Sequence, residues 1–124
     1  MKIKITIGST ILEADLDTST ISKDILKYLP LETEANIWGG EIYFILPEML
    51  DYPGQTDEVE IGDVAFWPNG PALCLFFGET PGSFTNKPRP HSVSVVIGKI
   101  KNIESKIPEL MKMIDGIKVK VEKA

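Results

Sequence analysis

The sequence predicts a mainly-β domain whose antiparallel strands close on themselves as a barrel, accompanied by two short helices. Apolar and polar residues alternate in many short segments, and turns rich in glycine and proline separate those segments. Nowhere do strand and helix patterns alternate as they do in a parallel sheet. Closure into a barrel removes the exposed edges that so many short strands would otherwise leave.

The alternation places the strands. Isoleucine occupies every second position of residues 3–7, and Gly8-Ser9 marks a tight turn into the segment 11–16, which is expected to pair with the first strand as a hairpin. Further strands are expected at residues 31–37, 41–46, 59–67, 72–77, 93–100 and 117–121. Turn residues join them at 38–40, 51–54 and 68–71.

Two helices are expected between these strands. Residues 17–20 offer side-chain oxygens for an N-cap, the following apolar residues 21, 25, 26 and 29 share one helical face, and Pro30 ends the helix. The spacing of these apolar residues suits a helix that packs across one open end of a barrel. The second helix is expected to carry Pro108 in its first turn and to end before Gly116. Its apolar side would consist of Ile107, Leu110, Met111 and Ile114.

The segment Gly78–Pro90 is the longest irregular stretch. It contains two glycines and three prolines, and it exceeds the usual connection of about 4–6 residues. Long loops on rigid barrels often carry binding function, whereas the alternative is a surface excursion without a role. The sequence leaves both interpretations open.

The length and the net charge of the chain limit its domain number and its possible partners. One domain is expected over residues 1–124, because this length is near the commonest for a single core. The net charge of −5, from 18 acidic and 13 basic side chains, argues against a nucleic-acid partner. Lysines 118, 120 and 123 alternate with apolar residues and are interpreted as the solvent side of the last strand.

The compartment is expected to be the cytoplasm. Cys74 is the only cysteine, so no internal disulfide can form, which suits a reducing environment. The alternating N-terminus does not resemble a signal peptide, and no segment approaches the roughly 18 apolar residues needed to cross a membrane. Abundant lysine and isoleucine with a single glutamine are typical of a thermophilic source, although genomic base composition explains them equally well.

Residues that could carry enzyme chemistry are sparse. Neither glycine-rich phosphate-binding motif occurs, and His91 is the sole histidine. Cys74 lies in a strongly apolar run and is expected to be a buried, inert thiol, while His91 is expected at the surface of a loop end. The acidic residues 57, 58, 60 and 63 are interpreted as an exposed strand edge, so neither a metal nor another cofactor is expected.

Several stretches together resemble a known family. They are Trp38-Gly39-Gly40-Glu41-Ile42-Tyr43-Phe44, the segment from Val59 to Gly70 with its Ile61-Gly62-Asp63-Val64, the strand Ala72–Gly78, and Ser94–Ile100. Over roughly residues 1–100 the chain is similar to the small prokaryotic cyclophilin-like proteins, a family mostly of unknown function. The resemblance implies an eight-stranded antiparallel barrel with a capping helix at each end. It offers no counterpart for residues 107–121.

The resemblance also implies where a binding groove would lie. In cyclophilins an arginine donates a hydrogen bond to the twisted prolyl nitrogen and so lowers the isomerisation barrier. Phe44 takes the position of that arginine here, Tyr43 that of the preceding histidine, Tyr52 that of a glutamine and Ser94 that of a pocket histidine. The implied groove is apolar and lacks this donor. It would be lined by Tyr43, Phe44, Met49, Leu50, Tyr52, Phe66, Phe76 and Ser94.

Three functions follow as hypotheses. The favoured one is binding of a peptide or small ligand in the apolar groove without strong isomerase activity. The second is a weak peptidyl-prolyl isomerase in which Tyr43, Tyr52 or Arg89 supplies the missing donor. The third is a non-catalytic interaction subunit, such as a homodimer. An alternative to the groove is that Phe66, Phe76 and Phe77 fill the interior of the barrel. Adjacent residues of a strand face opposite sides, so one member of the pair Phe76 and Phe77 must point inward.

Overall fold

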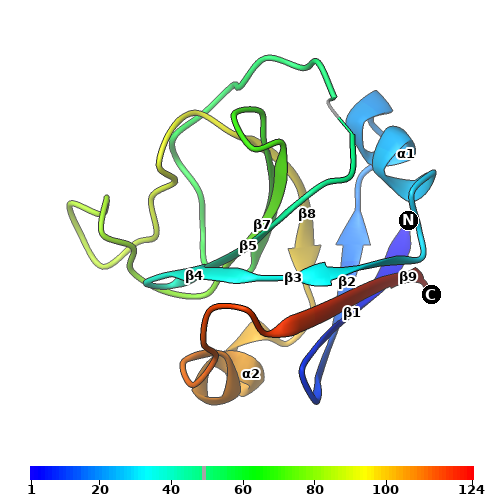
Figure 1. Cartoon of the computed structure of the whole chain (residues 1–124). Helices are drawn as coiled ribbons and strands as arrows, with labels where there is room; N and C mark the ends of the chain where they lie inside the picture. Colours follow the sequence, from blue (N-terminus) through cyan, green and yellow to red (C-terminus); the bar gives the residue numbers. More distant parts are fainter. Residues whose placement is uncertain (49) are drawn as a thin grey trace.

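The computed structural model describes residues 1–48 and 50–124. Nine strands and two helices make up this part of the chain (Figure 1). In chain order they are β1 (Lys2–Ile7), β2 (Thr10–Leu16), α1 (Thr20–Leu26), β3 (Leu31–Glu34), β4 (Asn36–Trp38), β5 (Glu41–Ile45), β6 (Asp63–Trp67), β7 (Ala72–Phe76), β8 (Val95–Ile100), α2 (Ile103–Leu110) and β9 (Lys118–Lys123).

The strands form one antiparallel sheet that is nearly closed into a barrel. Their order is β3-β9-β1-β2-β8-β6-β7-β5-β4. The two outermost strands, β3 and β4, are consecutive in the chain and are separated only by Ala35. Because β3 pairs with β9 while β4 pairs with β5, the chain itself connects the two ends of the sheet. The mainly-β barrel predicted from the sequence is therefore confirmed.

The strand count is nine rather than eight because one predicted strand is divided. Residues 31–37 were expected as a single strand, and the division falls at Ala35, whose amide still donates to the carbonyl of Ile117 at 2.8 Å. Beyond it, the amide of Ile37 donates to the Asp115 carboxylate at 2.7 Å instead of to a strand. The chain thus leaves β9 at this point and crosses to β5, and the ladder is interrupted there.

Two other predicted strands begin later than expected. β6 starts at Asp63 instead of Val59, because Gly62 adopts a φ of 96° and the Asp63 amide closes a turn onto the Glu60 carbonyl at 3.0 Å. A positive φ of this kind is readily accessible only to glycine. β8 starts at Val95 instead of Val93, and Ser94 makes only an isolated bridge to Thr56.

Alternate side chains of the strands fill the barrel. Ile3, Ile5 and Ile7 are fully buried, as their spacing predicted, and the two large rings of Phe44 and Phe66 lie in the same core. A second, smaller apolar cluster lies on the opposite face of β5, β6 and β7. It consists of Val59, Ala65, Ala72, Cys74 and Phe76, with Tyr43 and Trp67 packed against it. This region of the sheet is therefore covered on both faces.

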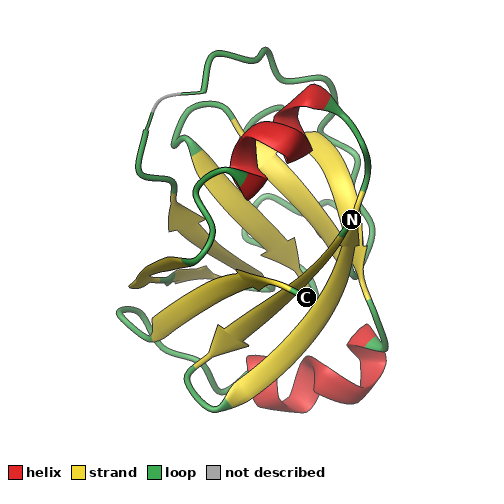
Figure 2. Cartoon of the chain, turned by 90° about the vertical axis from the view of Figure 1, so that its right-hand side faces the viewer, coloured by secondary structure: helices red, strands yellow, loops and turns green. Residues whose placement is uncertain are grey.

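The helices lie at opposite ends of the barrel (Figure 2). In α1 the Ser19 hydroxyl caps the amide of Ser22, as the N-cap signal predicted, and Ile21 and Ile25 are buried. α2 contradicts its prediction: it begins at Ile103, so Pro108 is its sixth residue and not part of its first turn. Burial of Ile103 and Leu110 decides this placement. Of the four residues expected on the apolar side, Leu110 is buried and Ile107 packs partly buried against the core, whereas Met111 and Ile114 are exposed.

The C-terminal strand is an integral part of the sheet. β9 lies between β1 and β3, with Val119 and Val121 buried, while the side chains of Lys118 and Lys123 are exposed. The barrel needs this strand to approach closure, although the sequence resemblance offered no counterpart for it. Among the described residues, no helix is long and apolar enough to span a membrane.

Candidate functional site

A pocket of about 210 Å³ lies on the outer face of the barrel wall formed by β5, β6 and β7. On these strands alternate residues point into the barrel, while their neighbours point outward beneath two irregular segments. Cross-strand register aligns Tyr43 of β5 with Cys74 of β7, and Cys74 with Ala65 of β6. The pocket is lined by Trp38, Glu41, Tyr43, Trp67, Cys74, Pro90, His91 and Ser94.

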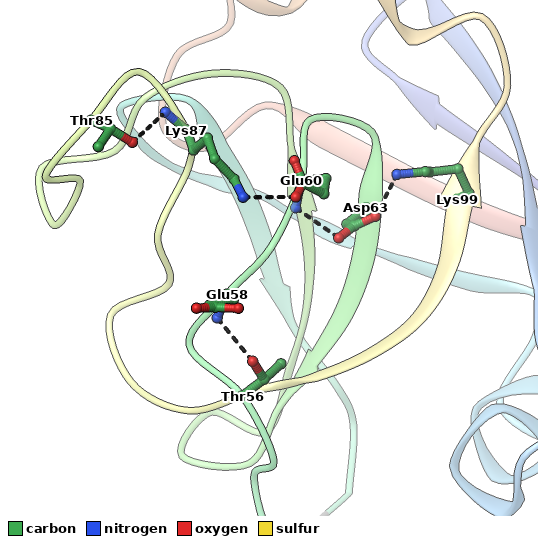
Figure 3. Close-up of polar contacts among 7 residues, drawn as sticks. All are labelled: Thr56, Glu58, Glu60, Asp63, Thr85, Lys87 and Lys99. Carbon is green, nitrogen blue, oxygen red and sulfur yellow. Dashed lines mark hydrogen bonds and ion pairs between the residues drawn. The ribbon is translucent and has the colours of Figure 1, made fainter.

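The long segment after β7 is tied to the segment before β6, which lies beside it (Figure 1). Lys87 forms an ion pair with Glu60 at 2.7 Å, and Arg89 forms one with Asp57 at 2.8 Å. Figure 3 shows the first of these pairs, together with Asp63, which accepts from the Glu60 amide and from Lys99 at 2.8 Å each. Exposed pairs of this kind contribute little to stability, but they join the two segments at these points. The Gly78–Pro90 loop is therefore packed against the wall and leads directly into Pro90 and His91 of the pocket.

These pairings also account for the acidic residues 57, 60 and 63, each of which has a cationic partner. Glu58 is exposed, and its amide is bonded to Thr56 (Figure 3). Within residues 1–48 and 50–124, no group of three metal-binding side chains occurs.

Aromatic rings make up most of the pocket wall. The His91 ring meets Trp38 and Trp67 edge to face, with centroids 5.7 and 5.9 Å apart, and Tyr43 meets Trp67 at 6.1 Å. The indole nitrogen of Trp67 donates to the Ser92 hydroxyl at 2.6 Å. Ser94, which is fully buried, donates its hydroxyl to the Ser92 carbonyl at 3.2 Å. The Trp67 ring is therefore oriented by a hydrogen bond, and the His91 and Tyr43 rings pack against it.

A carboxyl group lies among these rings. Glu41 opens β5, and only 5% of its surface is exposed. Burial raises the pKa of its carboxyl to about 7, an increase that hydrogen bonding from the Cys74 thiol limits. Its Oε1 atom has no hydrogen-bond partner among the described residues. A buried polar atom without a partner is rare in native proteins and calls for an explanation.

Cys74 is buried, as the sequence predicted. Burial, together with the nearby Glu41 carboxyl, raises the pKa of its thiol well above the usual value. The thiol therefore stays protonated and acts as a hydrogen-bond donor instead of a nucleophile. His91 is exposed, as expected for the end of a loop, but its ring closes one side of the pocket.

The structure separates the residues that were expected to share one groove. Tyr43 and Ser94 line the pocket, whereas Phe44 and Phe66 point the opposite way and are fully buried in the barrel. Phe76 belongs to the cluster beneath the loop segments. The expectation that Phe44 and Phe66 line an open groove is corrected, because adjacent residues of a strand face opposite sides.

The remaining groove residues lie near α1. Leu50 packs into the barrel core, while Tyr52 meets Phe66 edge to face and donates its hydroxyl to Asp24. Met49 lies outside the described residues. Of the three suggested isomerase donors, only Tyr43 lines the pocket. Arg89 is paired with Asp57, and its guanidinium carbon lies 4.8 Å from the centroid of the Phe84 ring.

Six of the eight pocket residues were not expected in a binding site from the sequence: Trp38, Glu41, Trp67, Cys74, Pro90 and His91. A signal was present for Glu41, because it lies two residues before Tyr43 on the same strand and therefore on the same face. What the sequence lacked was any sign that residues 54–62 and 78–94 cover this face of the sheet.

Comparisons with known proteins complete the description. The model of a family described as cyclophilin-like matches residues 1–122. The solution structure of a hypothetical protein from Archaeoglobus fulgidus matches with a TM-score of 0.82 and 38% sequence identity, covering 100% of this chain and 95% of that one. The structure of McbB in complex with tryptophan matches at a TM-score of 0.66 with 16% identity, over 98% of this chain and 44% of that one, which shows a shared fold only. No protein of curated function matches in sequence.

Proposed function

Given that the chain belongs to the cyclophilin-like family, we propose that it binds a small molecule, or a single side chain of a peptide, in the pocket on the outer face of β5, β6 and β7. The observation that carries this proposal is the wall of Trp38, Tyr43, Trp67 and His91, whose rings pack edge to face, with Trp67 hydrogen-bonded to Ser92. Concave sites with apolar rings and a few converging polar groups are typical of ligand pockets.

The size of the pocket supports a compact ligand. Its volume of about 210 Å³ is below the range of roughly 300–1,000 Å³ that is usual for drug-sized ligands. An extended peptide spanning several residues would need a longer groove. The proposal therefore concerns one ring, one short chain or one side chain at a time.

The two tryptophans provide a direct test of binding. Trp38 and Trp67 are the only tryptophans of the chain, and both line the pocket. A library of small aromatic and amine compounds and short proline peptides is expected to contain members that change tryptophan fluorescence saturably. In a nitrogen–proton spectrum, the same members should shift the Trp67 side-chain signal and the backbone signals of His91 and Ser94. Shifts confined to the α1 or α2 end of the barrel, or none at millimolar concentration, would contradict the proposal and favour the interaction-subunit hypothesis.

Prolyl isomerase activity is expected to be close to absent. Catalysis needs a donor aimed at the prolyl nitrogen, and Arg89 is paired with Asp57. In a peptide assay the protein at micromolar concentration should leave the uncatalysed exchange, which takes tens to hundreds of seconds, nearly unchanged. Strong acceleration would instead support a weak-isomerase function. Loss of that acceleration in Tyr43→Phe, but not in Tyr52→Phe, would then identify the donor.

A further inference from the structure

We propose that the ligand of this pocket carries a protonated primary or secondary amine on an apolar body, and that its ammonium group binds the Glu41 carboxylate. This inference rests on the proposed function and names the chemical class of its ligand.

The Glu41 carboxyl lacks a full set of hydrogen-bond partners. A carboxylate removed from water needs hydrogen-bond donors on both oxygens or a positive partner. The Cys74 thiol is one donor, and it is weak. Oε1 has none among the described residues, although the side chain is 95% buried and lines the pocket. Because Glu41 lines the pocket, a donor that enters the pocket can bind its carboxylate group.

The neighbouring cations of the chain are committed elsewhere. None of the eight residues lining the pocket is a lysine or an arginine. On the loop segments around it, Lys87 pairs with Glu60 and Arg89 with Asp57, and on β8 Lys99 pairs with Asp63. Among the lining residues only His91 could carry a positive charge, and its ring packs edge to face against Trp38 and Trp67. We therefore expect the positive charge for Glu41 to come with the ligand.

The rest of the wall also suits a cation. The faces of indole and phenol rings attract cations, and the rings of Trp38, Tyr43 and Trp67 surround the space next to Glu41. The Ser94 hydroxyl has given its hydrogen to the Ser92 carbonyl, so it can offer only lone pairs to a ligand. Acceptors and π faces together favour a cation, and they disfavour an anion. The need of the Glu41 carboxylate for a hydrogen-bond donor distinguishes an ammonium with N–H groups from a quaternary one.

The titration of Glu41 gives this inference a second measurable consequence. With a pKa raised to about 7, the carboxyl is partly protonated in the empty pocket, and an ammonium ligand must displace that proton. An alkylamine itself stays protonated up to a pH of about 10. The titratable groups that face Glu41 are Cys74 from β7, Tyr43 from β5 and His91 from the segment after the loop.

Four matched probes test the inference on the intact protein: 2-phenylethylamine, the neutral 2-phenylethanol, the trimethylated quaternary amine of the same skeleton, and 3-phenylpropanoate. Tryptophan fluorescence and calorimetry at pH 8 are expected to show the amine binding about 10- to 100-fold more tightly than the alcohol, as a charge-assisted hydrogen bond would give. The quaternary amine should bind several-fold more weakly than the primary amine, and the anion should not bind.

Substitution then assigns the effect to one side chain. In Glu41→Gln the affinity for the amine should fall about tenfold or more, while that for the alcohol changes less than about threefold. Glu79→Gln removes an exposed carboxylate of the nearby loop and should leave both affinities unchanged. Between pH 8 and pH 6 the wild-type affinity for the amine should fall about tenfold, because the ionised fraction of Glu41 falls by that factor. This dependence should persist in His91→Gln and vanish in Glu41→Gln.

The outcomes distinguish the two proposals. Equal binding of amine and alcohol, or an amine affinity unaffected by Glu41→Gln, would overturn the amine inference while leaving a ligand pocket in place. Equal binding of the primary and quaternary amines would overturn the proposed hydrogen bond to the Glu41 carboxylate. Failure of all four probes to bind, with no response from the wider library, would remove the proposed function itself.

Discussion

Replacement of Phe44 by arginine is expected to unfold the protein instead of restoring an isomerase. Phe44 holds the position that the resemblance assigns to the catalytic arginine, so this change is the obvious attempt to install activity. Its side chain, however, is fully buried in the barrel core opposite Leu73. An unpaired guanidinium there costs several kcal/mol, against a total stability of about 5–15 kcal/mol for a typical domain. Near-UV circular dichroism and urea unfolding should show the loss of cooperative structure.

The adjacent residue provides the matched control. Tyr43 lies on the same strand but points outward into the pocket, where Glu41 can pair with a new cation. Tyr43→Arg is therefore expected to stay folded. Phe44→Leu should also fold, with a loss of about 1–2 kcal/mol from the smaller side chain. A native-like spectrum and cooperative unfolding for Phe44→Arg would show that the assigned direction of β5 is wrong.

Glu41→Gln is expected to raise stability at alkaline pH and to remove a distinctive pH dependence. The folded-state pKa of Glu41 is raised from its usual 4.5 to about 7, so the folded protein holds this proton more tightly than the unfolded chain does. Protonation of Glu41 therefore stabilises the fold below about pH 4.5, and this contribution is lost as the pH rises through 7. A rise of that size is equivalent to about 3 kcal/mol. At pH 8 the glutamine variant should be more stable by up to this amount, whereas at pH 5 the difference should fall below about 1 kcal/mol.

The measurement is the free energy of unfolding in urea at pH 5 and pH 8 for both proteins. Other carboxylates act in the opposite sense: hydrogen bonds from Tyr52 and Lys87 lower the pKa of Asp24 and Glu60. Because both proteins share those groups, the difference between them isolates Glu41. Glu79→Gln should follow the wild type. Parallel curves for wild type and Glu41→Gln would mean that the carboxyl titrates as in water and is not desolvated by the fold.

The candidate site was only partly accessible from the sequence. Tyr43 and Ser94 were expected in a binding site and line the pocket, and Cys74 was expected to be buried and is. Phe44 was assigned to the same surface as Tyr43, which the two-residue period of a strand forbids. The Ala72–Phe77 run is apolar on both faces, so its composition could not show which residues face the barrel and which face outward.

Sequence alone determined the features that depend on neighbours along the chain. The alternation of Ile3, Ile5 and Ile7, the turn at Gly8-Ser9 and the capping signal at Ser19 each led to the element that the structure contains. These features are local, because hydrogen bonding and side-chain direction within a strand or a helical turn involve residues a few positions apart.

Tertiary structure decided what depends on segments distant in the chain. The division of residues 31–37 at Ala35 follows from contacts with the C-terminal residues 115–117 and with β5, and the start of α2 follows from the burial of Ile103. The pocket collects residues from positions 38 to 94 under a loop held by ion pairs. Glu41 became a buried carboxyl only because that loop covers an outer face of the sheet, where a strand pattern by itself predicts solvent.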